Sequence, residues 1–283
     1  GAAAAGGAGA GGAGALAQAV GDRPDLTNQV LQALGALCAP PGLAALPPGA
    51  ARWVVEDALT LRHVAACAAA NLLGALPPAA LGDLGAVWRG LLDLCGRMAA
   101  EAQALGAGVL RETVNAAGTA PDLWFQSLTA TLPVLLRRFG AELAAGGLVT
   151  EEALGGLLQL CQWPGGAEVR CNALAALGAL GAAPHPPEQN LLLAGAFAAA
   201  CRDPSPLVAA EALNTVMDVY ADEDHNASYE ASGLRAVVDA IIPDFKAKVK
   251  QDGQALGREQ YLFLKETSLN IIRFKKYKDS TMK

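Results

Sequence analysis

Apolar residues recur three and four positions apart through most of the chain after Leu16, and this spacing places them on one face of an α-helix. The pattern predicts helices over 30–38, 63–76, 83–105, 122–139, 150–161, 168–180, 188–201, 206–218, 232–250 and 258–278. Proline lacks a backbone N–H, so Pro133 should kink or split the helix over 122–139, and Pro243 should kink the helix over 232–250. We expect an almost entirely helical protein.

Two of these helices repeat one another. "EVRCNALAALGAL" (168–180) aligns with "PLVAAEALNTVMD" (206–218) at an offset of 39 residues. The alignment places Val169 on Val208, Ala173 on Ala212 and Leu174 on Leu213. Each copy follows another predicted helix and a short connector, "QWPGG" or "RDPSP", which indicates repeated antiparallel helix pairs. Such a pair cannot bury both its apolar faces alone, so the predicted fold is all-α, an α-solenoid of HEAT or armadillo-like helical hairpins. An irregular helical bundle is the alternative.

A weaker repeat lies further towards the N-terminus. Leu-Gly-Ala-Leu occurs at 73–76 and again at 177–180, 104 residues apart, so the repeat register between 39 and 150 is not regular. "VLQALGALC" (30–38) is a further, weaker copy. Residues 1–15 are only glycine and alanine and are predicted to be disordered. We therefore expect a solenoid over 16–283, with 230–283 as its C-terminal capping helix pair.

Composition supports a helical protein and argues against a membrane span. Hydrophobic residues make up 53% of the chain but aromatic residues only 5%, so alanine and leucine carry the apolar content. The longest uncharged stretch, 26–51, is interrupted by two Pro-Pro pairs, whereas a membrane helix needs about 20 consecutive apolar residues. No secretory signal is visible. The chain does not begin with methionine, which is consistent with an excerpt of a longer protein.

The reactive residue types do not form a recognisable catalytic motif. The six cysteines occur singly in apolar runs and without a C-x-x-C pair, which favours reduced core cysteines in an intracellular protein over a zinc site (Cys38, Cys67, Cys95, Cys161, Cys171 and Cys201). The three histidines lack helical metal-ligand spacing (His63, His185 and His225). No catalytic serine, phosphate-binding loop or cofactor motif is apparent, so we expect neither an enzyme, nor a cofactor, nor a bound metal.

An acidic cluster is the one candidate site. Asp218, Asp222, Glu223 and Asp224 lie within nine residues, in "DVYADEDHN". The cluster lacks the alternating ligands and the glycine of a calcium loop, so a solvated acidic loop is favoured over a cation site. We treat these four residues as a candidate partner-binding surface.

Charge is distributed unevenly along the chain. Residues 1–244 hold 23 acidic and 11 basic side chains, a net charge of −12, whereas residues 245–283 hold 10 basic and 4 acidic side chains, a net charge of +6. All eight lysines of the chain lie in the second segment. This asymmetry predicts different partners for the two segments. Binding of nucleic acid or of an anionic membrane by the basic end is a weaker alternative.

We interpret the basic end as a structural cap. A terminal repeat needs a polar outer face, and Lys246, Lys248, Lys250, Lys275, Lys276 and Lys278 would supply it. The residues expected to close the core beneath them are Ile242, Phe245, Leu264, Ile271 and Ile272. In the last helix Tyr261 would join these aliphatic residues on one side, with Phe263, Asn270, Phe274 and Tyr277 on the opposite side. Both sides would then be covered, one by the neighbouring helix and the other by a returning loop.

The C-terminal residues resemble a known family. "EALNTVMDVYADED" (211–224) and "FKAKVKQDGQALGREQYLFLKETSLNIIRFKKYKD" (245–279) are similar to the C-terminal end of the symportin family, also called HEAT repeat-containing protein 3. The resemblance rests on the aliphatic helix ending in D-V-Y-A-D, the F-K-x-K-V-K-x-D-G element, the helix opened by R-E-Q and the closing R-F-x-x-Y. The upstream repeats agree only in type.

The resemblance implies a function that fits the acidic body of the chain. It implies a non-enzymatic adaptor that binds two basic ribosomal proteins of the 5S ribonucleoprotein and accompanies them, with an importin, from cytoplasm to nucleus. The importin would bind a part of the protein not recognisable in this chain, and no direct nucleic-acid or membrane contact is implied. A generic HEAT scaffold of the phosphatase or transport-receptor type is the alternative.

Overall fold

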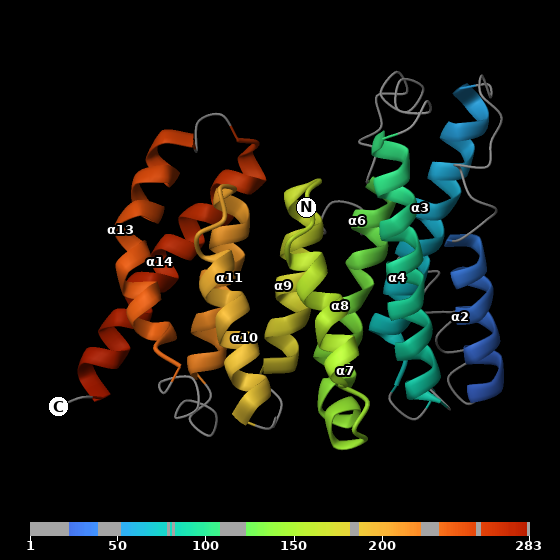
Figure 1. The fold of residues 1–283 in the computed structure, drawn as a ribbon, viewed down its shortest axis with the longest axis horizontal. Coiled ribbons are helices and arrows are strands. Elements are labelled where there is room, and N and C mark those ends of the chain that lie inside the picture. The colour runs from blue at the N-terminus through green and yellow to red at the C-terminus, as the bar shows by residue number, and fades with distance from the viewer. Residues whose placement is uncertain are drawn as a thin grey trace. The chain divides into compact units, whose positions relative to one another are not determined.

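The computed structural model describes residues 23–38, 52–77, 80, 83–107, 123–181, 187–221, 232–252 and 256–281. Helix is the regular secondary structure throughout these residues, as Figure 1 shows. The prediction of an all-α fold is therefore confirmed. The chain divides into two compact units, residues 2–156 and 157–283, which we call the N-terminal unit and the C-terminal unit.

Two helices of 24 residues each pack against most of the other helices of the N-terminal unit. Its described helices are α2 (Pro24–Cys38), α3 (Arg52–Ala75), α4 (Leu84–Ala107), α6 (Leu123–Thr129) and α7 (Thr131–Ala145). Helix α3 packs against α2, α6 and α7, and α4 packs against α2 and α6. The largest fully buried apolar side chains of this unit are Leu72, Leu76, Trp88, Phe125, Leu132 and Phe139.

The predicted helix over 122–139 is split, but not at its proline. The break lies at Ala130, between α6 and α7, and Pro133 is the third residue of α7. The first N–H groups of a helix have no partner within that helix, so a proline there removes no hydrogen bond. Pro133 therefore sits in the first turn of a new helix. Pro243, by contrast, lies in the interior of α13, and the helix continues through it. The kink expected there stays a prediction.

An arginine links α7 to the end of α3. The guanidinium group of Arg138 donates to the carbonyl oxygens of Gly74 and Leu76. The last carbonyls of a helix have no partner within the helix, and a basic side chain can satisfy them. Gly74 also lies beside α7, and a Cβ added to it would be 3.6 Å from Cγ1 of Val134, an ordinary van der Waals distance.

One stretch of α3 is long and apolar enough to cross a membrane by length and composition alone. It covers Asp57–Ala75, and a third of its most apolar window is buried inside the molecule. The stretch contains Arg62, which is 1% exposed and forms an ion pair with Glu101 at 2.7 Å. Helix α3 also packs against α2, α6 and α7.

The C-terminal unit contains the predicted repeat. Helix α8 (Glu151–Cys161) crosses the division between the units, and α9 (Ala167–Gly181), α10 (Pro187–Ala200), α11 (Pro206–Ala221), α13 (Leu234–Asp252) and α14 (Arg258–Thr281) follow. The six aligned repeat residues are all 0% exposed: Val169, Ala173 and Leu174 in α9, and Val208, Ala212 and Leu213 in α11. Equivalent positions therefore have equivalent burial, which confirms the 39-residue alignment.

Helices α9 and α11 approach each other closely at a glycine. A Cβ added to Gly178 would lie 2.6 Å from Cγ2 and 3.2 Å from Oγ1 of Thr215. Thr215 is itself 5% exposed, so it lies within the interface. Only a residue without a Cβ fits at position 178 without displacing α11 or this side chain.

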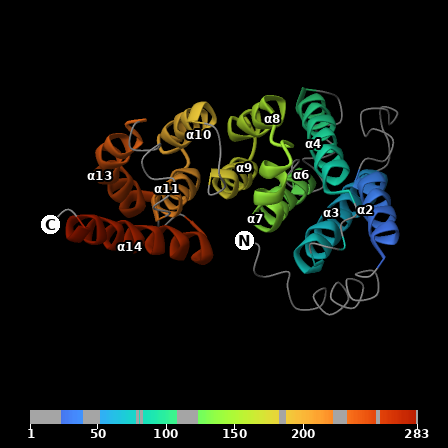
Figure 2. The ribbon, with the colours of Figure 1, turned by 90° about the horizontal axis from the view of Figure 1, so that it is seen from below.

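Helix α14 lies across α11 and α13 rather than alongside them, as Figure 2 shows. It buries Leu264, Thr267 and Ile271, and Phe274 contacts Tyr220 of α11 edge-on, with ring centroids 6.1 Å apart. The prediction that Ile242, Phe245, Leu264 and Ile271 are buried is confirmed.

The prediction for Ile272 is wrong, because this side chain is 41% exposed. Leu264 and Ile271 are seven residues apart and share a face, whereas Ile272 is turned about 100° away from Ile271. Tyr261, which was assigned to the same aliphatic side, is 40% exposed, and Leu262 and Leu269 are exposed as well. The buried face of α14 therefore runs between the two sides expected from the sequence.

The lysines of α13 differ from one another. Lys246 and Lys250 are exposed, as a solvated outer face requires. Lys248 is half-buried, and its ammonium group donates to the carbonyl oxygen of Asp203 at 3.4 Å. The side chains of Lys275, Lys276 and Lys278 lie outside the described part of the structure, so the capping role remains a prediction.

Candidate functional site

The most connected polar site described in the C-terminal unit is centred on Arg170, in the first turn of α9. Its Nε donates to Oδ2 of Asp203 at 2.9 Å, and its Nη2 donates to Oδ1 at 3.1 Å. Both side chains are 13% exposed. This two-pronged contact of a planar guanidinium group with a carboxylate is the strongest type of protein ion pair.

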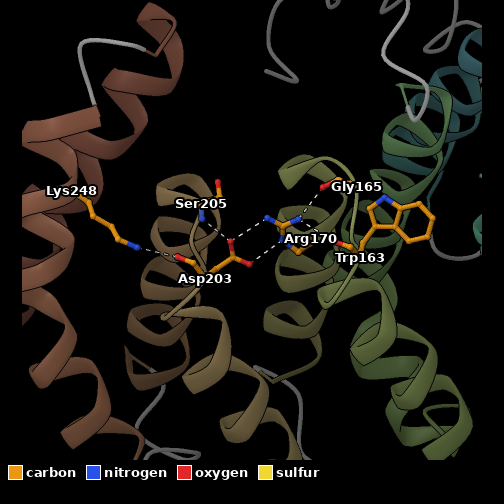
Figure 3. A network of polar contacts seen from close by, with 6 residues as sticks. All are labelled: Trp163, Gly165, Arg170, Asp203, Ser205 and Lys248. Atoms are coloured by element: carbon orange, nitrogen blue, oxygen red, sulfur yellow. Dashed lines mark hydrogen bonds and ion pairs between the residues drawn. The ribbon is translucent and has the colours of Figure 1, made fainter. Parts of the chain in front are cut away.

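The same arginine also holds the preceding connector. Its Nη1 donates to the carbonyl oxygens of Trp163 and Gly165, both at 3.0 Å, within "QWPGG". Figure 3 shows these contacts as dashed lines that converge on the guanidinium group between the two connectors. One side chain thus fixes the α8–α9 connector and joins it to the α10–α11 connector.

Asp203 extends the network to the next helix. Its Oδ1 accepts the backbone N–H of Ser205 at 2.8 Å, which fixes the turn that begins α11. Its carbonyl oxygen accepts from Lys248 of α13, as Figure 3 also shows. The residues Trp163, Gly165, Arg170, Asp203, Ser205 and Lys248 therefore form a ladder that runs from hairpin to hairpin, and we call it the connector ladder.

The contacts of the connector ladder hold loops and helices in position. The carboxylate of Asp203 accepts hydrogen bonds from the guanidinium group and from a backbone amide. Each contact joins a loop to the neighbouring helix pair. The ladder therefore fixes the spacing of consecutive hairpins, on which any surface shared by them depends.

The sequence-predicted acidic cluster is only partly described. Asp218 lies in the last turns of α11, and its side chain is exposed. Asp222, Glu223 and Asp224 lie outside the described residues. The assignment of these four carboxylates to partner binding therefore stays a prediction.

The described histidine and the described acidic residues do not assemble a metal centre. Among the residues that the structure describes, no group of three or more His, Cys, Asp or Glu side chains could hold a metal ion. His63 instead contacts Ser127 and Cys67. His185 and His225 fall outside the described ranges.

Sequence reasoning missed the connector ladder. Its signal was present, because "RDPSP" places an aspartate directly before a proline in the second connector and "EVR" places an arginine just after the first. The two residues are 33 positions apart, and the 39-residue offset aligns Arg170 with Ala209 rather than with another arginine. The ladder joins different positions of successive repeats, so alignment of the repeats alone does not reveal it.

Comparison with known proteins places the chain in a family. A search of curated proteins gave no match. A family model described as "SYO1-like, TPR repeats" matches residues 28–282. That description names TPR rather than HEAT repeats, and both are paired antiparallel helices that stack into α-solenoids. The start-to-start spacing of α9 and α11, 167 to 206, is nearer the roughly 40 residues of a HEAT repeat than the roughly 34 of a TPR. The match covers most of the chain, which therefore belongs to the SYO1-like, or symportin, family of α-solenoid proteins.

Proposed function

We propose that this chain is a non-enzymatic adaptor that binds basic ribosomal proteins of the 5S ribonucleoprotein and supports their nuclear import and the assembly of the large ribosomal subunit. The observation that carries the proposal is the family match over residues 28–282. The protein would act in the cytoplasm and the nucleus, with an importin bound elsewhere. Helical-repeat families of this kind bind proteins on extended stacked surfaces.

The surface charge of the chain supports a basic client. Before residue 245, exposed acidic side chains outnumber exposed basic side chains among the described residues. The exposed acidic residues are Asp25, Asp57, Asp83, Asp93, Glu142, Glu151, Glu152, Glu168, Asp218, Asp239 and Asp244. Arginines that would offset them, such as Arg138 and Arg170, are turned towards protein carbonyl and carboxylate groups. Such a surface attracts cationic, RNA-binding clients and shields them from other polyanions.

The proposal is tested by titrating the full chain with a purified basic ribosomal protein of the 5S ribonucleoprotein. We expect binding that weakens from about 0.1 M to about 1 M salt, because the screening length falls from about 10 Å to about 3 Å. Absence of binding would remove the client assignment. Capture of a phosphatase or a transport receptor in place of the ribosomal protein would favour the generic scaffold.

Matched variants test the acidic cluster as the contact surface. One variant carries Asp218→Asn, Asp222→Asn, Glu223→Gln and Asp224→Asn. The control removes four exposed charges elsewhere in the chain by Glu142→Gln, Glu151→Gln, Glu152→Gln and Glu168→Gln. If the cluster contacts the client, the first variant should weaken binding about tenfold or more, and the control should weaken it less. Equal weakening would mean that net charge, not the cluster, attracts the client.

A further inference from the structure

Three reactive side chains meet between α3 and α6 in the N-terminal unit. His63 and Cys67 lie four residues apart on α3, a spacing that places them on one face of a helix. The sulfur of Cys67 is 3.9 Å from Nε2 of His63, and Nδ1 of His63 is 2.6 Å from the hydroxyl oxygen of Ser127 on α6. The proposed adaptor function makes no use of this group.

The order of these contacts suits transfer of the thiol proton. When the imidazole ring accepts that proton, both of its nitrogens become donors. Nε2–H then faces the thiolate of Cys67, and Nδ1–H faces the hydroxyl oxygen of Ser127, which can accept it. Ser127 thereby orients the ring and stabilises its charged form, as the third member of a nucleophile–base–orienting group does.

The other five cysteines lie in surroundings that oppose ionisation. Burial raises the pKa of the Cys38 thiol to about 11 and those of Cys95, Cys161 and Cys201 to about 12. Burial also raises the pKa of Cys171, and the nearby carboxylates of Glu211, Glu168 and Asp203 raise it further. Thiolate is the reactive form of cysteine, so these five should react slowly.

Cys67 differs from the other five cysteines in its partner, and from three of them in burial. It is half-buried, like Cys161 and Cys171, whereas Cys38, Cys95 and Cys201 are buried. Cys38, by contrast, is buried and directs its thiol to the carbonyl oxygen of Arg62, a group that cannot take its proton. A thiol becomes a nucleophile where a neighbouring base can take its proton.

We infer that Cys67, with His63 as its proton acceptor and Ser127 as the positioning residue, is a reactive thiol that hydroperoxides oxidise to the sulfenic acid. The thiolate sulfur attacks one peroxide oxygen, the S–O bond forms and the O–O bond breaks. The departing hydroxide takes the proton held by His63 and leaves as water. One hydrogen peroxide is thus reduced as one thiol is oxidised.

The experiment measures all six cysteines in the same folded chain. The full-length protein is treated briefly with iodoacetamide, or with hydrogen peroxide and a sulfenic-acid trap, and the modified fraction of each cysteine is read by peptide mass spectrometry. Cys67 should react at least about tenfold faster than Cys161 and Cys171, the other two half-buried thiols. A rate no higher than theirs would overturn the inference without any variant.

Variants test whether His63 accepts the thiol proton or only packs against Cys67. His63→Gln keeps a hydrogen-bonding side chain but cannot take the proton, so the rate at Cys67 should fall about tenfold. Ser127→Ala should lower the rate, and Ser127→Thr, which keeps the hydroxyl group, should restore it. The buried Cys95 is the internal control, because a variant that opens the fold exposes Cys95 as well. An unchanged rate at Cys67 in His63→Gln, with Cys95 still protected, would overturn the role of His63.

Discussion

The sequence Leu-Gly-Ala-Leu occurs at 34–37, 73–76 and 177–180, and the glycine has a different role in the two copies that end α3 and α9. A Cβ on Gly74 would meet Val134 at 3.6 Å, whereas a Cβ on Gly178 would lie 2.6 Å from Thr215. The first site has room for a methyl group and the second does not. The leucines of these two copies are buried alike, although the next helix approaches them at different distances. In the copy at 34–37 Leu37 is 43% exposed, so the four letters by themselves do not fix burial either.

The largest expected effect tests the shared part of the motif. Leu73 is 2% exposed and Leu177 is 0% exposed, so each leucine fills a packed interior. We expect Leu73→Ala and Leu177→Ala each to lower the free energy of unfolding by about 2 to 5 kcal/mol, through lost transfer energy and a residual cavity. Chemical denaturation monitored by circular dichroism measures both. A loss below about 1 kcal/mol at either position would break the equivalence of the two motifs.

Two arginines, one from each unit, should give a smaller difference in stability. Arg138 donates to carbonyl oxygens at the end of α3, whereas Arg170 also pairs with a carboxylate that is 13% exposed. Arg170→Ala should lower the free energy of unfolding by about 2 to 3 kcal/mol, because it leaves Asp203 without its cation in a partly buried site. Arg138→Ala should lower the free energy of unfolding by about 1 kcal/mol less than Arg170→Ala does, since the carbonyl partners of Arg138 are neutral. The double variant Arg170→Ala, Asp203→Asn should recover part of the loss. No recovery would mean that the pair is not coupled.

The glycines themselves give the sharpest contrast. Gly178→Ala should lower the free energy of unfolding by about 1 to 2 kcal/mol, because the new methyl group forces α11 or Thr215 to move. Gly74→Ala is the matched control and should be neutral or stabilising by up to about 1 kcal/mol, as alanine favours a helix. Combining Gly178→Ala with Thr215→Ser removes the methyl group that the new Cβ would meet and should restore stability. If the two glycine variants lower the free energy of unfolding equally, the helix neighbouring Gly178 does not approach more closely than the helix neighbouring Gly74.

The smallest expected effect concerns the outer face of the C-terminal unit. Ile272 is 41% exposed, so Ile272→Ala should lower the free energy of unfolding by about 1 kcal/mol or less. The adjacent Ile271 is 1% exposed, and Ile271→Ala should cost about 2 to 5 kcal/mol. Thermal melts of the two variants compare them directly. A larger loss for Ile272→Ala would show that a further surface covers this face of α14.

Much of the fold could be predicted from the sequence, because helical periodicity reports which face of each segment is apolar. It located the helix pairs, and the 39-residue alignment located six residues that are all 0% exposed. It failed for Ile272, because a helix with apolar residues on several sides does not reveal which side meets the next helix. It also misplaced the break near Pro133, because the position of a proline within the first turn is not visible before the start of the helix is known.

The candidate site was harder to predict than the fold. Asp218 was singled out by local charge, and the structure places it at an exposed position on α11. Arg170 and Asp203 were not singled out, because their pairing depends on hairpins that bring together residues 33 positions apart. Local composition finds a cluster along the chain, whereas a ladder between repeats becomes visible only when the repeats are stacked.

The buried indole of Trp163 gives the molecule an optical property. Of the four tryptophans, Trp163 alone lies in residues 157–283, at 6% exposure, whereas Trp53, Trp88 and Trp124 belong to residues 2–156. The fluorescence of Trp163→Phe would report only on the N-terminal unit, and its difference from the unsubstituted chain would report on the C-terminal unit. Two emission curves from one titration would then show whether the two units melt together or in sequence. Since the backbone carbonyl of Trp163 accepts from Arg170, the difference signal should also change when the α8–α9 connector opens.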